Sequence, residues 1–325
     1  MAPVLKVEGL STFFDTRRGV IRAVDDVSLQ VEVGDTLGIV GESGCGKTVL
    51  SLSIMKLVPT PPGKYVGGKI LLGNHDLLRL PEKEMRKIRG KSISMIFQEP
   101  MTSLNPVFRI GDQIREALGL HQGGTRREVW ERAVEMLRTV GITKPEQRMR
   151  DYPHQLSGGM RQRVMIAMAL SCRPRLMIAD EPTTALDVTI QAQILELMKQ
   201  LQRELGTAVI LITHDLGVIS QTARQVAMMY AGQFVEWADA EVIFSRPLHP
   251  YTVGLLESIP RIGAKFGREK RLPMISGSAP DLAAIPAGCR FQDRCVDVMS
   301  VCRKLEPTWQ EKENPCHYVR CWKYH

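Results

Sequence analysis

The chain has 325 residues, which exceeds a typical single-domain length and predicts one large domain with a smaller appendage. Hydrophobic residues make up 44% and charged residues 24%, an ordinary composition for a soluble globular protein. No apolar run reaches about 18 residues, so no segment is expected to span a bilayer. The first residues lack the pattern of a secretion signal, and we expect the protein to remain inside the cell. The net charge of +8 comes from scattered residues and indicates no partner by itself.

The first third of the chain alternates extended segments with turns. Apolar and polar residues alternate over 4–7 and 21–31, as they do in half-buried strands. A short apolar run at 36–40 ends in a glycine-rich loop, and apolar residues then recur at helical spacing over 49–55. These segments predict a strand–loop–helix unit that stops at a proline cluster near residue 60. Residues 92–97 predict a further buried strand.

Helical patterns dominate the middle of the chain. Helices are expected at about 110–119, 126–140, 157–171 and 189–204, with buried strands at 176–179 and 208–212. Strands interleaved with helices predict an α/β core built on a parallel sheet. The helical stretch at about 103–172 is expected to form an inserted subdomain. After about residue 260 the periodicity fades, which predicts a small, irregular appendage.

The loop after the 36–40 strand has the P-loop pattern of a glycine, four residues and Gly-Lys-Thr: Gly41, Glu42, Ser43, Gly44, Cys45, Gly46, Lys47 and Thr48. Glycines let the backbone aim successive N–H groups at phosphate oxygens, and the following helix adds its positive dipole end. Lys47 is expected to reach the β and γ phosphates, and the Thr48 hydroxyl to bind Mg²⁺. An ordinary glycine-rich turn would not explain the strand before the loop or the helix after it. The pattern therefore predicts nucleotide binding.

Two carboxylates follow the buried strand at 176–179. Asp180 is expected to hold Mg²⁺, directly or through water, and Glu181 to polarise the water that attacks the γ phosphate. Alone, such a pair most often belongs to a solvated loop. Together with the P-loop it predicts the second half of an ATP-hydrolysing site.

A segment just before that strand reads Leu156, Ser157, Gly158, Gly159 and Met160. With it the chain resembles the ATP-binding cassette (ABC) family over roughly residues 4–260. The resemblance implies a P-loop NTPase fold with a RecA-like core, an antiparallel β subdomain and a helical subdomain. It also implies that Ser157, Gly158 and Gly159 complete the ATP pocket of an opposite subunit. Met160 departs from the family signature, where glutamine is usual.

The other elements of the family pattern follow in order. Gln98 resembles the glutamine that contacts Mg²⁺ or water and senses the membrane subunits, and His214 resembles the switch histidine at the γ phosphate. Asp187, after Ala185 and Leu186, resembles the D-loop aspartate at the dimer interface. Phe14 is a candidate to stack on adenine, although Phe13 is adjacent. Cys45 stands where the family often has serine; we expect its alkylation to inhibit and ATP to protect it.

The C-terminal part carries the segment His249-Pro250-Tyr251-Thr252, which resembles the opening of the C-terminal region in oligopeptide, dipeptide and nickel importer ATPases. His249 is interpreted as a turn residue without a catalytic role. The expected domains are an ATPase domain over 1–260 and this C-terminal region over 261–325.

Five of the seven cysteines lie in the last 37 residues. In a chain without a secretion signal, such crowding favours metal binding over disulfides. Four thiolates at Cys289, Cys295, Cys302 and Cys316 could hold zinc or an iron–sulfur cluster, or could remain reduced thiols. The resemblance implies a [4Fe-4S] cluster with a structural role. Cys321 lies outside that expected set.

The implied protein is an ATPase subunit that uses ATP and Mg²⁺ to power peptide import. Implied partners are a second, related cassette subunit, two transmembrane permease subunits and, indirectly, an extracytoplasmic solute-binding protein, with the chain peripheral on the cytoplasmic face of the inner membrane. A nickel or other small-solute importer would share this sequence pattern. A cassette ATPase acting on nucleic acid is a weaker alternative, because this chain has one cassette and no coiled-coil insertion.

Overall fold

The computed structural model describes residues 3–98, 103–184, 186–259, 274–312 and 316–325. It contains a mixed eight-stranded sheet with the strand order β11-β12-β10-β9-β3-β8-β7-β6. The strands of this sheet are β3 (Thr36–Val40), β6 (Ile93–Ile96), β7 (Leu176–Asp180), β8 (Ala208–Ile212), β9 (Gln225–Tyr230), β10 (Gln233–Asp239), β11 (Gln310–Lys312) and β12 (His317–Val319). From β6 to β9 neighbouring strands pair in parallel, and from β9 to β11 they pair antiparallel.

A second, antiparallel sheet has the order β2-β1-β4-β5. Its strands are β1 (Leu5–Thr16), β2 (Gly19–Val31), β4 (Gly63–Leu72) and β5 (His75–Asp76). It packs on the central sheet through a shared core in which Leu37, Ile39, Ile178 and Ile210 meet residues of β1, β2 and β4. The predicted α/β fold, with a parallel core and an antiparallel subdomain, is confirmed.

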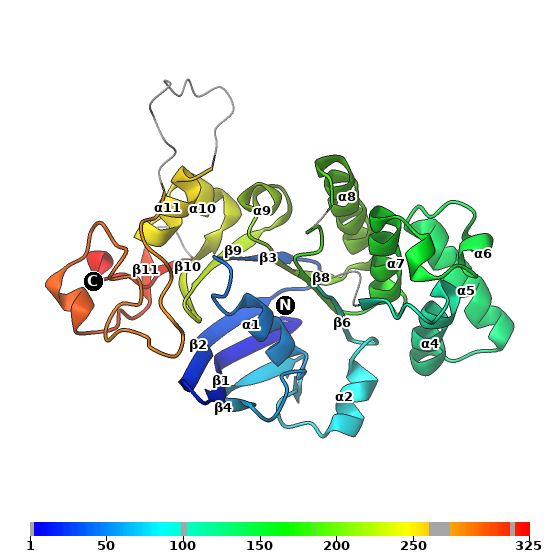
Figure 1. Ribbon diagram of the computed structural model, residues 1–325, viewed down its shortest axis with the longest axis horizontal. Helices are drawn as coiled ribbons and strands as arrows, with labels where there is room; N and C mark the ends of the chain where they lie inside the picture. Colours follow the sequence, from blue (N-terminus) through cyan, green and yellow to red (C-terminus); the bar gives the residue numbers. More distant parts are fainter. Residues whose placement is uncertain (1–2, 99–102, 185, 260–273, 313–315) are drawn as a thin grey trace.

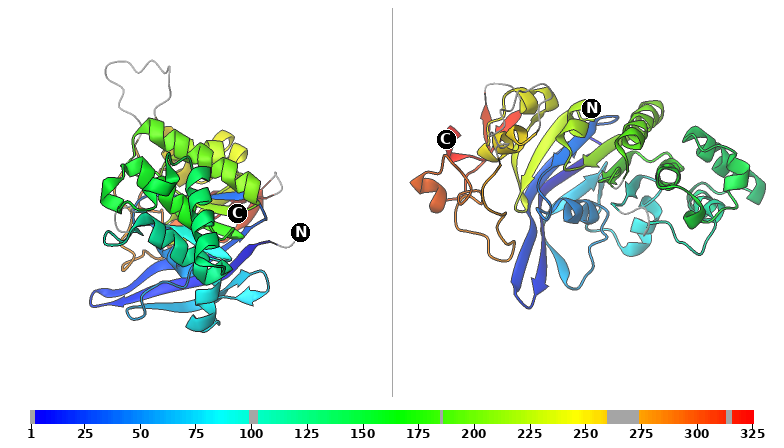
Figure 2. Two further views of the ribbon diagram at one scale, coloured as in Figure 1. Left: turned by 90° about the vertical axis from the view of Figure 1, so that its right-hand side faces the viewer. Right: turned by 45° about the horizontal axis from the view of Figure 1, so that its top comes forward.

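Several of the helices are grouped at one end of the molecule (Figures 1 and 2). The helices are α1 (Lys47–Ile54), α2 (Glu82–Ile88), α4 (Ile110–Gln122), α5 (Arg126–Thr139), α6 (Pro145–Arg148), α7 (Gly158–Leu170), α8 (Val188–Leu205), α9 (Leu216–Thr222), α10 (Ala240–Ser245) and α11 (Pro250–Glu257). Figures 1 and 2 show α4 to α7 grouped at one end of the molecule and the C-terminal region at the other end. No helix in the described part of the chain is both long and apolar enough to cross a membrane.

Local sequence sets where several of these helices begin. Thr125 and Glu128 form a reciprocal capping box at the start of α5. Ser157, Asp187 and Asp215 each accept a backbone N–H in the first turn of α7, α8 and α9. Two of these caps, Ser157 and Asp187, belong to the motifs that the sequence analysis singled out, so these motifs also have a structural use.

The C-terminal region is less independent than its sequence predicts. Strand β12 pairs with β10 and extends the central sheet beyond residue 260, a boundary residue that lies outside the described part of the chain. Arg290, whose side chain is buried, pairs with Asp25 at 2.5 Å, and Arg320 pairs with Asp26 at 2.7 Å. These pairs hold the irregular C-terminal region against β2 of the antiparallel sheet, and the expected domain boundary stays a prediction.

A buried carboxylate organises the start of α11. Glu236 on β10 is fully buried; it accepts the N–H groups of Leu248 and His249 at 2.7 and 2.9 Å and lies 2.8 Å from His317 Nε2. His249 then caps α11 by accepting the N–H of Tyr251 at 3.1 Å. Burial lowers the pKa of His249 to about 4, so the ring is neutral at physiological pH. His249 therefore has the turn role expected from the sequence.

Replacing Glu236 with alanine should destabilise the fold strongly. The substitution leaves two backbone N–H groups and His317 buried without their acceptor, and each such group costs about 1–3 kcal/mol. We expect a clear drop in the denaturation midpoint, measured by circular dichroism. Glu241→Ala, at an exposed carboxylate on α10, is the control and should change the midpoint little. Equal midpoints for the two variants would contradict this account of Glu236.

Candidate nucleotide site

The loop between β3 and α1 is packed so closely that glycine is required at two positions. A Cβ atom on Gly41 would lie 2.2 Å from the carbonyl oxygen of Met229, and one on Gly46 would lie 2.1 Å from the carbonyl oxygen of Ala23. Gly46 also has a φ of +109°, which side chains with a Cβ rarely adopt. The glycines predicted from the P-loop pattern are thus fixed by the packing of β9 and β2 around the loop.

Lys47 begins α1 and is buried. Its ammonium donates to the carbonyl oxygens of Gly41 and Glu42 at 2.7 and 2.9 Å, so the side chain folds back over its own loop. This arrangement places a positive charge beside the backbone N–H groups at the start of α1, where a helix favours anions. The loop is therefore suited to bind phosphate groups.

Asp180 ends β7, with its side chain next to α1. The carboxyl is almost fully buried, and its Oδ2 atom lies 3.5 Å from Ser51 Oγ. Burial raises the pKa of Asp180, while a hydrogen bond from Thr48 opposes that rise. Its Oδ1 atom is buried without a hydrogen-bond partner. A free carboxylate oxygen beside the Thr48 hydroxyl fits a hard cation such as Mg²⁺.

The carboxylate of Glu181 contacts both of the other predicted catalytic residues. Gln98 donates to Glu181 Oε2 at 3.1 Å, and His214 Nδ1 lies 3.3 Å from Oε1. Thr184, which the sequence analysis did not consider, donates to Oε2 at 2.9 Å. Burial alone would raise the pKa of Glu181, but the hydrogen bonds from His214 and Thr184 outweigh it and lower the pKa. The group is therefore an ionised carboxylate at neutral pH.

The signature segment and the D-loop lie side by side. A Cβ on Gly158 would lie 3.6 Å from Leu186 Cδ2, and one on Gly159 would lie 2.9 Å from Ile190 on α8. Ser157 accepts the N–H of Met160 at 3.3 Å, and Asp187 accepts that of Ile190 at 2.9 Å. Ser157, Gly158 and Asp187 are exposed, and Ala185 lies outside the described residues. These motifs therefore face solvent together.

Phe14 lies on β1 opposite Ile21 of β2 and Gly63 of β4. Its neighbour Phe13 packs against the guanidinium of Arg22, 5.7 Å from the ring centre. Phe14 is partly exposed. Its stacking on adenine stays a prediction.

Several of the C-terminal cysteines lie near Cys289. Cys289 donates its backbone N–H to Cys302 at 2.8 Å. Burial, with smaller contributions from the thiols of Cys302, Cys321 and Cys295, raises the pKa of Cys289 to about 12. Burial also raises the pKa of Cys295 and Cys321. The thiols of Cys295, Cys302 and Cys321 therefore lie close enough to Cys289 to act on it electrostatically.

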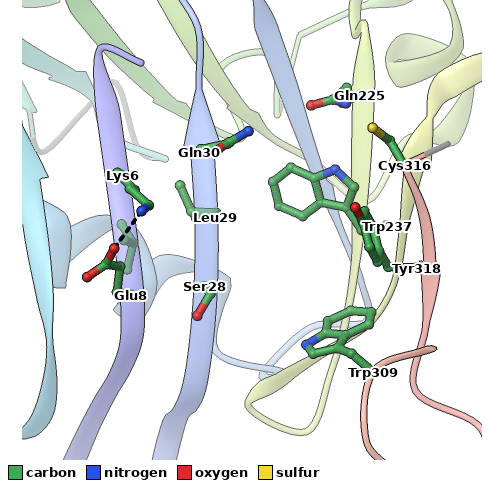
Figure 3. Close-up of a pocket in the computed structure, with 11 residues that line it drawn as sticks. Lys6, Glu8, Ser28, Leu29, Gln30, Gln225, Trp237, Trp309, Cys316 and Tyr318 are labelled. Carbon is green, nitrogen blue, oxygen red and sulfur yellow. Dashed lines mark ion pairs between the residues drawn. The ribbon is translucent and has the colours of Figure 1, made fainter. Parts of the chain in front are cut away.

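Cys316 belongs to the set expected from the sequence, and its role as a ligand stays a prediction. It is exposed and lines a hollow of about 440 Å³ beside Trp237, Trp309 and Tyr318 (Figure 3). The three-residue strand β12 lies between it and Cys321 in the sequence. Among the described side chains, no group of three or more His, Cys, Asp or Glu residues is arranged to hold a metal ion. Cysteine thiolates are the usual donors to iron–sulfur clusters, and binding of a cluster to this chain stays a prediction.

Cys45, in the P-loop, should react slowly with alkylating reagents. It is buried and lies 3.8 Å from Lys47 Nζ; burial raises its pKa more than the lysine lowers it, so little reactive thiolate forms. With limiting maleimide at neutral pH, we expect exposed Cys316 to be labelled about tenfold faster or more. Peptide mass spectrometry over time measures both sites, and Cys45→Ser identifies the slow one. Labelling of Cys45 as fast as Cys316 would contradict the burial argument.

Comparisons with known proteins agree with this geometry. The family model described as ABC transporter matches residues 24–184, and the model described as oligopeptide/dipeptide transporter, C-terminal region, matches residues 235–302. The oligopeptide transport ATP-binding protein AppD of Bacillus subtilis is 52% identical over 324 residues, covering 100% of this chain and 98% of that protein. The dipeptide transport ATP-binding protein DppD of the same organism is 52% identical over 322 residues, covering 99% and 95%. A probable peptide ABC transporter ATP-binding protein of Sinorhizobium fredii is 51% identical over 320 residues, covering 98% and 95%.

Solved structures give the same result for the fold. The ATP-binding cassette MJ0796, in a dimeric post-hydrolysis state bound to ADP and Pi, matches with a TM-score of 0.65 and 28% identity, covering 73% of this chain and 98% of that one. The cassette cbiO1 of Clostridium perfringens matches with a TM-score of 0.64 and 25% identity, covering 76% and 92%. The chain therefore belongs to the ABC transporter family, in the branch whose ATP-binding proteins carry the oligopeptide/dipeptide transporter C-terminal region.

Proposed function

We propose that this chain is an ATP-hydrolysing subunit that powers the import of di- or oligopeptides through a membrane ABC transporter. The observation that carries the proposal is whole-length similarity of 51 to 52% to proteins named for peptide, dipeptide and oligopeptide transport. The site supports the ATPase part independently, because a phosphate-binding loop, a cation-binding carboxylate and an ionised Glu181 meet at one edge of a parallel sheet.

The chemistry follows from the positions of these residues. The P-loop amides and Lys47 bind the β and γ phosphates. Thr48 and Asp180 would hold Mg²⁺, which would supply positive charge to neutralise the phosphates. Glu181 accepts a proton from the attacking water, while Gln98 and His214 fix the orientation of its carboxylate. His214 is largely exposed, so it is free to turn toward the γ phosphate when nucleotide binds.

A partner subunit completes the site. The exposed signature residues Ser157 and Gly158 would bind the nucleotide of a second cassette, and a related but different chain is the favoured partner. The MJ0796 cassette was solved as a dimer, which supports this arrangement. Two permease subunits would bind the closed pair at the cytoplasmic face of the inner membrane, and a solute-binding protein would deliver the peptide. ATP can shift the conformational equilibrium of the transporter only by the difference between its affinities for the two conformations.

The transported solute is tested in the assembled transporter. The chain is co-purified with its permeases and partner cassette, reconstituted in liposomes and mixed with its solute-binding protein. We expect a peptide-loaded binding protein to stimulate ATP hydrolysis and ATP-dependent peptide uptake. Stimulation by Ni²⁺ and not by peptides would favour the nickel importer, and ATP hydrolysis stimulated by DNA or RNA would favour the nucleic-acid alternative.

Glu181→Gln should separate ATP binding from ATP turnover. Glutamine keeps the size of the side chain but cannot accept the proton of the attacking water, and general-base catalysis contributes about 10²–10⁴-fold. We expect ATP affinity within a few-fold of the wild type and turnover lower by about 100-fold or more. Phosphate release and equilibrium ATP binding measure the two quantities.

Two further variants make the Glu181 result specific. Glu196→Gln, at an exposed position on α8, should hydrolyse ATP normally. Lys47→Ala should lose ATP affinity as well as turnover. Near-normal hydrolysis by Glu181→Gln would remove Glu181 from the role of general base.

We propose further that Cys289, Cys295, Cys302 and Cys321 are the ligands of the [4Fe-4S] cluster that the family resemblance implies. The support is that the backbone N–H of Cys289 donates to the carbonyl oxygen of Cys302 and that burial raises the pKa of Cys289, Cys295 and Cys321. Cluster binding would therefore have to displace thiol protons. The cluster would link the segments of the C-terminal region that carry the four cysteines, and it would take no part in ATP hydrolysis.

Matched serine variants test which cysteines bind iron. In protein purified without oxygen, we expect Cys321→Ser to lose the iron and the broad visible absorption of a cluster, and Cys316→Ser to keep both. Iron analysis and absorption spectra measure the outcome. Loss of iron in Cys316→Ser alone would restore the set expected from spacing, and a wild type without iron would contradict cluster binding.

A further inference from the structure

The P-loop contains a carboxylate that is held by the C-terminal region. Glu42 follows Gly41, and its side chain receives two hydrogen bonds from Arg294: Nη1 donates to Oε2 at 2.7 Å and Nη2 to Oε1 at 2.8 Å. The two residues are 252 positions apart in the sequence. Such a two-bonded guanidinium–carboxylate pair is among the stronger and more directional polar contacts in proteins.

Arg294 is built into its position. Its side chain is only 6% exposed, donates to the carbonyl oxygen of Ser276 at 3.0 Å and lies over the rings of Tyr230 and Phe291. The pair with Glu42 raises the pKa of Arg294 further, so it is charged at any physiological pH. A buried, fixed arginine of this kind is not a solvated surface charge.

A second contact from the same side reaches the same residue. Tyr251, in the His249-Pro250-Tyr251-Thr252 segment, accepts the backbone N–H of Glu42 at 2.9 Å. Its ring is fully buried and packs on Tyr230 and Phe291, with ring centres 4.7 and 5.6 Å away. The side chain and the main chain of Glu42 are thus both held by residues outside the ATP-binding motifs.

Electrostatics explains why this contact matters for nucleotide binding. Glu42 stands among the backbone groups expected to surround a triphosphate, where an unpaired carboxylate would repel phosphate oxygens. Arg294 neutralises that charge and turns the carboxylate away along a fixed direction. If the pair were lost, the carboxylate could turn back toward the phosphate site. The loop would then spend less time in its phosphate-binding conformation, and the apparent affinity for ATP would fall in proportion to that fraction of time.

We propose that Arg294 is a positioning residue for ATP binding: it neutralises and orients Glu42, and through Glu42 it holds the P-loop in its phosphate-binding conformation. The proposal rests on the proposed nucleotide site. It gives the C-terminal region a function in the ATPase reaction besides structure.

The test compares Mg·ATP affinity in the assembled transporter at low salt. We expect Arg294→Met to raise the dissociation constant about tenfold, with kcat at saturating ATP nearly unchanged. Adding Glu42→Gln to Arg294→Met should recover most of the affinity, because the repelling charge is removed. The dissociation constant of Arg294→Lys should lie between those of the wild type and Arg294→Met, because one charged contact remains.

A control variant and a readout without nucleotide make the outcome decisive. Arg303→Met removes an exposed arginine of the same region, paired with Asp293, and should leave ATP affinity unchanged. In nucleotide-free protein, amide hydrogen exchange over residues 41–48 should speed up in Arg294→Met and not in Arg303→Met. This measurement does not depend on ATP, so failure of the nucleotide site and failure of the Arg294 proposal can be told apart. Unchanged exchange in folded Arg294→Met, or no recovery in the double variant, would overturn the proposal.

Discussion

The close packing of the P-loop backbone is the constraint on which the rest of the site depends. The loop passes so near the carbonyl oxygens of Met229 and Ala23 that Gly41 and Gly46 have no room for a Cβ atom. Strand β9 and strand β2, from the two different sheets, therefore form the walls against which the phosphate-binding loop takes its shape. The antiparallel subdomain and the parallel core must dock correctly before this loop can bind phosphate, which ties nucleotide binding to the integrity of the whole cassette.

The parallel core explains why distant motifs meet. Strands β3, β7 and β8 run in the same direction as neighbours, so the residues that follow them, Gly41, Glu181 and His214, emerge at one edge of the sheet. Because buried parallel strands are short apolar runs and the motifs come directly after them, the sequence alone was sufficient to predict which residues emerge at this edge, while their catalytic roles stay predictions. It was also sufficient for the helical stretch between β6 and β7, whose periodicity is strong.

The long-range contacts of the C-terminal region could not be predicted in this way. Arg290, Arg294 and Glu236 form their pairs with residues that no local pattern connects to them, and a buried ion pair leaves no periodic signal in the sequence. For the same reason, the sequence could not show where Cys316 and Cys321 lie relative to each other. Spacing alone does not reveal that β12 pairs with β10 and carries one cysteine to each end of the strand. The register of β12 in the sheet decides where its flanking cysteines lie, and this register depends on tertiary structure.

Amide hydrogen exchange with and without Mg·ATP tests most directly whether these separated segments form one nucleotide site. The account predicts that ATP slows exchange together in three segments: the P-loop at 41–48, the end of β7 with Glu181, and the end of β8 with His214. Segments away from this edge of the sheet, such as helix α5, should be unaffected. Protection that is absent from the P-loop, or that appears only in segments away from this edge of the sheet, would contradict the account.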